Sequence, residues 1–435
     1  MAASQLPLAA VGRPAPFSLV ATGFAAGLLG WLAATAVLVV AAPDLAIGRY
    51  TADLPVLALH LAALVFLPYA VATAAWHVLP VMLRNDLAGT RRLWLAFGLL
   101  AGGIPLAVGI AADADSLAWP GAALVTAGLA IVLAELAGLV RRAPQGRMLV
   151  ASRVGVSLSG FHAAAALVLG AAVLGAQGPQ VLGVPYPRLM LVHLLLGALG
   201  WLTLLILAVG RTLAPMLALA PAAPPRRLPA LELAFTGALW LLLAGIAAGV
   251  RPLVAVGAAL VLLTFARFGL QLAGVVRRRR LDAMEAPLAH FLVGAACLVQ
   301  AVAVAFAALV GAVPDARAAA VAAILLVAGW GAGVTLGHAG KLLSLSAWST
   351  WPPGPRPKQR ALYPRLPWTI EAGLFGVGIE LVAVGTLIEA APPLRVGAGL
   401  LLAGAVLACV GALLTLRHAR AGRDDQRRST ASAAR

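Results

Sequence analysis

Twelve apolar stretches, each long enough to cross a bilayer, follow one another along this chain of 435 residues. A membrane-spanning helix needs about 20 apolar residues, because lipid offers the backbone no hydrogen-bond partners. The stretches cover residues 17–42, 54–83, 93–112, 118–140, 148–176, 187–219, 230–250, 252–276, 286–312, 318–346, 368–388 and 394–416. Some are separated by only a few residues, so one crossing fewer or more also fits the pattern. The sequence predicts an all-α, polytopic membrane protein of about twelve transmembrane helices.

Composition supports a single transmembrane domain over residues 1–416. Hydrophobic residues make up 62% of the chain and charged residues only 11%. A soluble protein of this length would then have too few polar residues to cover its surface. The segment 417–435 is polar and basic, and we expect it to form a disordered cytoplasmic tail.

The net charge of +17 is distributed over alternate loops. One set of loops carries Arg84, Arg91, Arg92, Arg141, Arg142, Arg147, Arg153, Arg226, Arg227, Arg277, Arg278, Arg279, Arg280, Arg356, Lys358, Arg360 and Arg365. The other set holds single cations and most of the loop acids. This is the positive-inside pattern, so we expect a multi-pass protein of a bacterial plasma (inner) membrane with both termini in the cytoplasm. The bilayer is then the partner of the basic residues, and no nucleic-acid partner is expected.

Two of the twelve segments look like versions of one helix. The second contains HLAALVFLPYAVATAAWHVLPVML from His60, and the sixth contains HLLLGALGWLTLLILAVGRTLAPML from His193. Each begins with His-Leu and closes with a polar residue, a few apolar residues and a proline. The tenth segment ends GWGAGVTLGHAGKLLSL and carries Lys341 where the sixth has Arg211. A spacing of four helices predicts three four-helix units around helices two, six and ten.

This arrangement resembles subunit I of the heme-copper oxidases. The segments LVHLLLGALGWLTLLILAVGRTLAPML and GHAGKLLSLSAW are most similar to the small non-oxidase relatives of that subunit, including the NnrS family. In the oxidases, histidines on helices two and ten hold a low-spin heme, and helix six supplies one histidine to a copper centre. The resemblance therefore implies a heme protein in which His60 and His193, near the outer ends of their helices, bind heme iron or copper.

The sequence also departs from the oxidase pattern. The seventh segment, ELAFTGALWLLLAGIAAGV, has no histidine pair, so the copper site is incomplete, and the histidine of the tenth segment, His338, comes late in the helix. These departures argue against an oxygen-reducing oxidase. The resemblance implies a role in nitric-oxide handling, electron transfer, or heme or metal trafficking. If the protein is an enzyme, we expect it to resemble an oxidoreductase. A redox partner or a respiratory complex is the candidate partner.

Other ionisable residues lie inside the predicted helices, where they are costly and therefore candidates for function. These secondary candidates are His338, His77, His162, His290 and Lys341. A second heme, a proton path or a set of hydrogen-bonded structural groups all fit them.

Two other functions fit a chain of twelve helices. A secondary transporter or exporter would normally show a two-fold repeat of six helices, whereas the similarity here has a period of four. A non-catalytic assembly partner of a respiratory complex would have lost its ligand positions, and it predicts that His60 and His193 do not face each other.

Overall fold

The computed structural model describes residues 12–144, 150–176, 180–181, 183–217, 220–221, 229–279, 285–352, 354 and 356–433. Within these residues, 12 helical spans are long and apolar enough to cross a membrane, and one pair of two-residue strands, Gln180–Val181 (β1) and Val184–Pro185 (β2), is present. The predicted all-α polytopic membrane protein is confirmed. Arg147, Arg226, Arg227 and Arg280, which belong to the predicted charge pattern, lie outside the described residues.

The spans are numbered here in chain order. Spans one to four are α1 (Phe17–Ala46); α2 (Asp53–Leu61), η2 (Ala62–Phe66) and α3 (Leu67–Met82); α4 (Thr90–Leu100) and α5 (Gly103–Ala111); and α6 (Asp115–Arg142). Spans five to eight are α7 (Val150–Leu174); α8 (Tyr186–Leu195), η3 (Leu196–Thr203) and α9 (Leu204–Leu217); α10 (Pro229–Ala248); and α11 (Arg251–Arg277). Spans nine to twelve are α12 (Ala286–Leu309); α13 (Asp315–Ala323), η4 (Ile324–Ala332) and α14 (Gly333–Ser349); α15 (Arg365–Leu387); and α16 (Ala391–Ala433). A short 3-10 helix, η5 (Gln359–Leu362), precedes span eleven.

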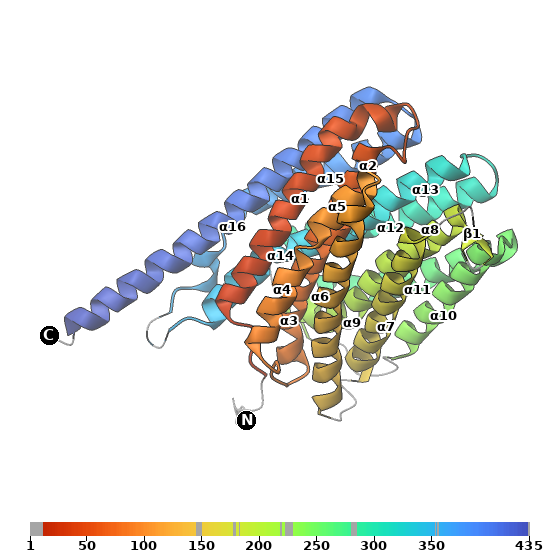
Figure 1. Cartoon of the computed structure of the whole chain (residues 1–435). Helices are drawn as coiled ribbons and strands as arrows, with labels where there is room; N and C mark the ends of the chain where they lie inside the picture. The colour runs from red at the N-terminus through yellow and green to blue at the C-terminus, as the bar shows by residue number, and fades with distance from the viewer. Residues whose placement is uncertain are drawn as a thin grey trace.

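The spans group into three units of four. In each unit the first span packs against the second, and the third packs against the fourth. The units meet through α6 and α7, through α11 and α12, and through α16 and α1, so they close into a ring; α1 and α16 run side by side in Figure 1. We call the side of the bundle that carries Arg92, Arg142, Arg277 and Arg365 the basic side, and the other end the opposite side.

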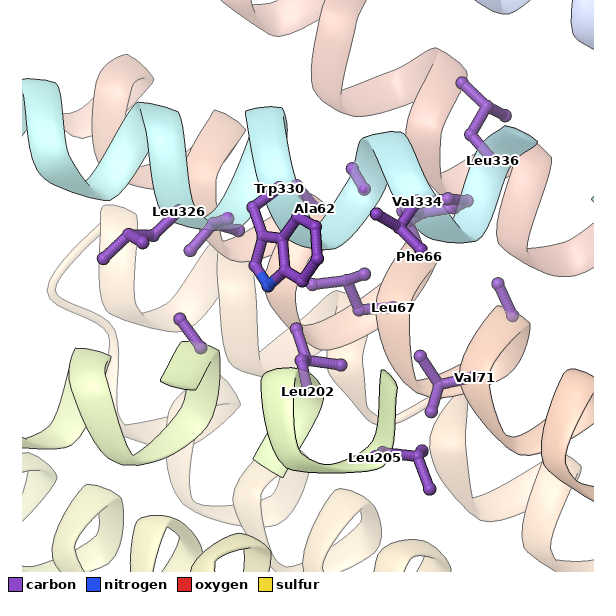
Figure 2. Close-up of a cluster of buried hydrophobic side chains, with 14 of the residues drawn as sticks. Ala62, Phe66, Leu67, Val71, Leu202, Leu205, Leu326, Trp330, Val334 and Leu336 are labelled. Carbon is purple, nitrogen blue, oxygen red and sulfur yellow. The ribbon is translucent and has the colours of Figure 1, made fainter. Parts of the chain in front are cut away.

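Spans two, six and ten are the most buried of the twelve and meet at the centre of the ring. Their contact is apolar: Figure 2 shows Trp330 of span ten facing Leu67 of span two and Leu202 of span six. The Trp330 Nε1–H donates to the Thr203 Oγ1 at 2.7 Å, which links spans ten and six. A Cβ on Gly331 would lie 2.9 Å from the Leu202 Cδ1, so spans ten and six approach each other closely here. The predicted arrangement around helices two, six and ten is therefore present.

Each central span is interrupted by a π-helical segment, η2, η3 or η4. The α-helices that precede these segments, α2, α8 and α13, are 9, 10 and 9 residues long, so the interruption recurs at the same depth. In span two the cause is local, because Pro68 has no N–H to donate to the Leu64 carbonyl four residues earlier. Spans six and ten have no proline there. π-helical turns are rare and often lie at functional sites.

The C-terminal segment corrects one expectation. Helix α16 continues from the membrane span to Ala433, where we expected a disordered tail from residue 417, and Figure 1 shows it extending beyond the bundle. The Arg423 guanidinium lies 4.8 Å from the Phe17 ring centroid and 5.6 Å from that of Trp351, and Ala419 is fully buried. Extending an existing helix also avoids the cost of nucleation. Packing against distant aromatic rings therefore orders a segment whose composition alone predicts disorder.

Candidate functional site

His60 and His193 occupy equivalent positions in two central spans. Each is the eighth residue of its helix, α2 or α8, and comes just before the π-helical segment. The eighth residue of α13, the corresponding helix of span ten, is Ala322. Two of the three central spans therefore present a histidine at this depth, about two turns from the opposite side, and the third presents only a methyl group.

Both imidazoles are held by backbone carbonyl groups. The His60 Nδ1 lies 2.8 Å from the Val56 carbonyl oxygen, and the His193 Nδ1 lies 3.0 Å from that of Ala166 in α7. A carbonyl oxygen only accepts, so each Nδ1 carries the proton and donates it. Each Nε2 then keeps its lone pair, and within the described residues it has no hydrogen-bond partner. A metal-binding histidine is oriented in the same way, by its second ring nitrogen.

The two histidines belong to different four-helix units, His60 to the first and His193 to the second. The His193 ring also packs against α7, where a Cβ on Gly170 would lie 2.8 Å from the His193 Cε1. In α2 and α8, the side chains of Leu57, Leu191 and Leu194 are half-buried.

A separate apolar groove of about 90 Å³ runs between spans one, two and ten. Pro55, Ala58 and Ala62 of span two line it, at the spacing of one helix face. His60 follows Ala58 by two residues and so points to the other face of α2. A volume of this size holds about three water molecules and not a porphyrin.

An ion-paired cluster closes the groove at the opposite side. The Tyr50 hydroxyl donates to the Glu389 Oε1 at 2.7 Å, and the Arg317 Nη2 lies 2.6 Å from the Glu389 Oε2. These bonds connect the loop after span one, the start of span ten and the loop after span eleven. They hold the pKa of Glu389 below its ordinary value of 4.5. Burial, followed by the bond to Glu389, raises the pKa of Tyr50.

This cluster predicts a pH dependence of stability. Because the pKa of folded Glu389 is lowered, its carboxylate contributes fully at a pH above 4.5, and the contribution is lost as the pH falls through the lowered value. We expect Glu389→Gln to give a smaller decline in melting temperature between pH 7 and pH 3 than the wild type gives. Asp44→Asn, which removes only the exposed pair with Arg49, is the control and should leave the slope unchanged. Equal slopes for the wild type and Glu389→Gln would contradict the prediction.

Three of the secondary candidates gather toward the basic side, in the third unit. The His338 Nδ1 donates to the Val334 carbonyl at 2.7 Å. The His290 Nε2 lies 2.7 Å from the Glu371 Oε2, with both side chains fully buried. The Lys341 Nζ lies 2.8 Å from the Glu285 Oε2. These pairs satisfy only part of the buried polar atoms, because the His290 Nδ1 and the Glu371 Oε1 have no partner within the described residues.

Tyr363 covers this group from the loop before span eleven. Its ring centroid lies 5.4 Å from the Lys341 Nζ. Burial, and then the charges of Glu285 and Glu371, raise the pKa of its hydroxyl. The cluster therefore holds two pairs of ionisable side chains, Lys341 with Glu285 and His290 with Glu371.

His77 and His162 remain apart from both groups. His77 is buried in α3, and its Nδ1 has no hydrogen-bond partner within the described residues. The His162 Nδ1 donates to the Leu158 carbonyl at 2.7 Å, and its ring packs against Trp240 at a centroid distance of 5.7 Å. In the part of the chain that the structure describes, no three His, Cys, Asp or Glu side chains come together so that they could hold a metal ion.

Sequence reasoning missed several groups that complete these sites. Ala166 fixes His193 through a backbone oxygen, which no residue pattern reveals. Glu232 of span seven lies 3.2 Å from the Arg211 Nη1 of span six, and Glu285 pairs with Lys341. The sequence does contain a pattern that could have revealed these two pairs. Each acid lies close to the start of an apolar segment, and its basic partner lies near the end of an adjacent apolar segment.

No family model matches the chain, and no curated protein matches it significantly.

Proposed function

We propose that this membrane protein binds heme between His60 and His193 and serves in electron transfer or nitric-oxide handling. The observation that supports the proposal is the pair itself: two imidazoles at equivalent positions of two central spans, each with its Nδ1–H bound to a carbonyl and its Nε2 free. Neutral imidazole with a free Nε2 is a good axial ligand for heme iron. When bound, heme would supply one-electron redox chemistry or a site for a diatomic ligand.

The residues around the pair have two tasks in this proposal. The carbonyls of Val56 and Ala166 fix the ring orientations and increase the basicity of each Nε2. Leu57, Leu191 and Leu194, on the same helices as the histidines, are half-buried and would offer apolar surface. Such walls exclude water and stabilise a porphyrin through burial of its own apolar surface.

The number of spans fits a transporter equally well, and the period of four spans is what supports the proposal. The contacts and the π-helical segments recur every four spans, whereas a transporter of two six-helix halves would recur every six. Three four-helix units around spans two, six and ten are also what the resemblance to oxidase subunit I implies.

We extend the proposal to orientation. The positive-inside rule assigns the basic side to the cytoplasm of a bacterial inner membrane, with both termini on that side. His60 and His193 then lie in the outer half of the membrane, about two turns from the outer surface. A redox partner would approach them from that surface.

The test is the visible spectrum of the full-length protein, purified in mild detergent, oxidised and then reduced with dithionite. We expect a Soret band and sharp α and β bands in the reduced state, the signature of low-spin, bis-histidine heme. Absence of a Soret band after expression with added heme would overturn the proposal and make transport the leading function.

A further inference from the structure

A hollow of about 410 Å³ lies on the basic side, between spans three and four. Three arginines line it, Arg92 from α4 and Arg141 and Arg142 from the end of α6, together with the carboxylate of Glu135. Its apolar wall is formed by Leu95, of which 56% is exposed, and Ile131. Both apolar residues belong to membrane spans, so the hollow joins the polar end of the bundle to its lipid-facing surface.

The loop between spans two and three forms one side of this hollow and is fixed to α6 by three hydrogen bonds. The Asn85 Nδ2 donates to the Leu139 carbonyl at 3.3 Å, and the Ala88 N–H donates to the Glu135 Oε2 at 3.3 Å. The Arg142 Nη2 donates to the Asp86 carbonyl at 3.2 Å. The hollow is therefore a built feature of the fold rather than a gap between mobile side chains.

Gly138 leaves room for one of the arginines. A Cβ at this position would lie 2.9 Å from the Arg142 Nη1, so the guanidinium folds back over the helix at the site where α6 lacks a side chain. The guanidinium is thereby directed along the wall of the hollow and not away from the bundle. Glu135 at its base is only 4% exposed.

The charges of the hollow are not balanced. Within the described residues, none of its three arginines forms an ion pair with a carboxylate, and the Glu135 carboxylate is the only acidic group in the lining. A guanidinium binds phosphate oxygens through parallel N–H donors. The excess of positive charge beside an apolar wall at a membrane boundary fits one ligand chemistry, a phosphate that carries an acyl chain.

We propose that this hollow binds an anionic phospholipid. Its phosphate lies between Arg92, Arg141 and Arg142, and one acyl chain follows Leu95 and Ile131 into the bilayer. A headgroup with hydroxyl donors, such as that of phosphatidylglycerol, also hydrogen-bonds to the Glu135 carboxylate. Inorganic phosphate offers the same anion without the apolar contact, so it binds more weakly than the lipid.

The test is lipid titration of the full-length protein in detergent, followed by native mass spectrometry. Phosphatidylglycerol is expected to bind more tightly than phosphatidylcholine. Arg92→Gln/Arg141→Gln is the informative variant, because it leaves the Arg142 bond to the loop in place. We expect it to weaken phosphatidylglycerol binding by roughly 10- to 30-fold, since each of these two guanidinium groups loses its contact with the phosphate. If that variant does not fold, Arg141→Gln alone is expected to weaken binding about fivefold.

The matched control is Arg84→Gln/Arg91→Gln. It removes the same charge from the same loop region, but neither arginine lines the hollow. Binding should stay within about twofold of wild type. Equal affinity for the two lipids, equal losses in the test and control variants, or displacement of the lipid by an equal concentration of inorganic phosphate would each overturn the proposal.

Discussion

His60→Ala is expected to remove the Soret band and the reduced α band from the purified protein, and His193→Ala is expected to do the same. In the proposed site each imidazole would supply one of the two protein bonds to the iron, and the third central span has Ala322 at that depth and so offers no replacement. The heme content should fall from roughly one per chain to near zero. It is measured as heme absorbance relative to protein, on material that elutes as a single species in gel filtration.

Two controls separate ligation from folding. His338→Ala removes a histidine with the same Nδ1-to-carbonyl bond from another central span, and it should leave the spectrum unchanged. Free imidazole added to the His60→Ala protein with heme should restore a low-spin spectrum, which a purely structural role for His60 would not allow. If His338→Ala loses heme while His60→Ala keeps it, the assignment of the ligands is wrong.

The largest loss of stability is expected for Glu371→Leu. The Glu371 and His290 side chains are both fully buried, and the variant leaves the His290 Nε2 without its 2.7 Å partner while its Nδ1 already has none within the described residues. Removing one member of a buried pair typically costs about 3–5 kcal/mol. We expect a loss of this size in the free energy of unfolding, measured by denaturant titration of the protein in mixed micelles.

Two milder substitutions near this pair are compared with Glu371→Leu in their effect on the free energy of unfolding. Glu371→Gln keeps an acceptor for the His290 N–H, so its loss should be about half that of Glu371→Leu or less. Glu285→Gln weakens the Lys341 pair, whose side chains are 17% and 18% exposed, and should cost about 1 kcal/mol. Similar losses in all three variants would contradict the view that burial of the His290–Glu371 pair determines the effect.

The membrane spans could be predicted from the sequence to within a few residues at most of their ends. Span one was expected over 17–42 and is Phe17–Ala46, and span eleven was expected over 368–388 and is Arg365–Leu387. The reason is physical: the bilayer requires a run of apolar residues of defined length, and that run is visible in one dimension. The equivalent depth of His60 and His193 was also predictable, because both follow the start of their spans by the same number of residues, whereas their pairing at a ligand stays a prediction.

Features that depend on contacts between distant residues could not be predicted. Composition predicts disorder after residue 416, whereas Arg423 packs against Phe17 and Trp351, which are far away in the sequence. The bond from His193 to Ala166 uses a backbone oxygen and leaves no mark in the sequence. The π-helical segments are equally hidden, since leucine- and glycine-rich residues such as 196–203 have the composition of an ordinary apolar helix.

The interruptions of the central spans have a consequence for the direction in which the histidines point. A π-helical turn accommodates about one residue more than an α-helical turn, and one residue corresponds to about 100° of rotation around the axis. Deleting one residue from 62–66 would let η2 rewind as α-helix and would turn the His60 end of the span by about 100° relative to α3. The direction in which each histidine points around the helix axis is therefore set by the length of the π-helical segment. The packing of the α-helix that follows this segment does not have to change.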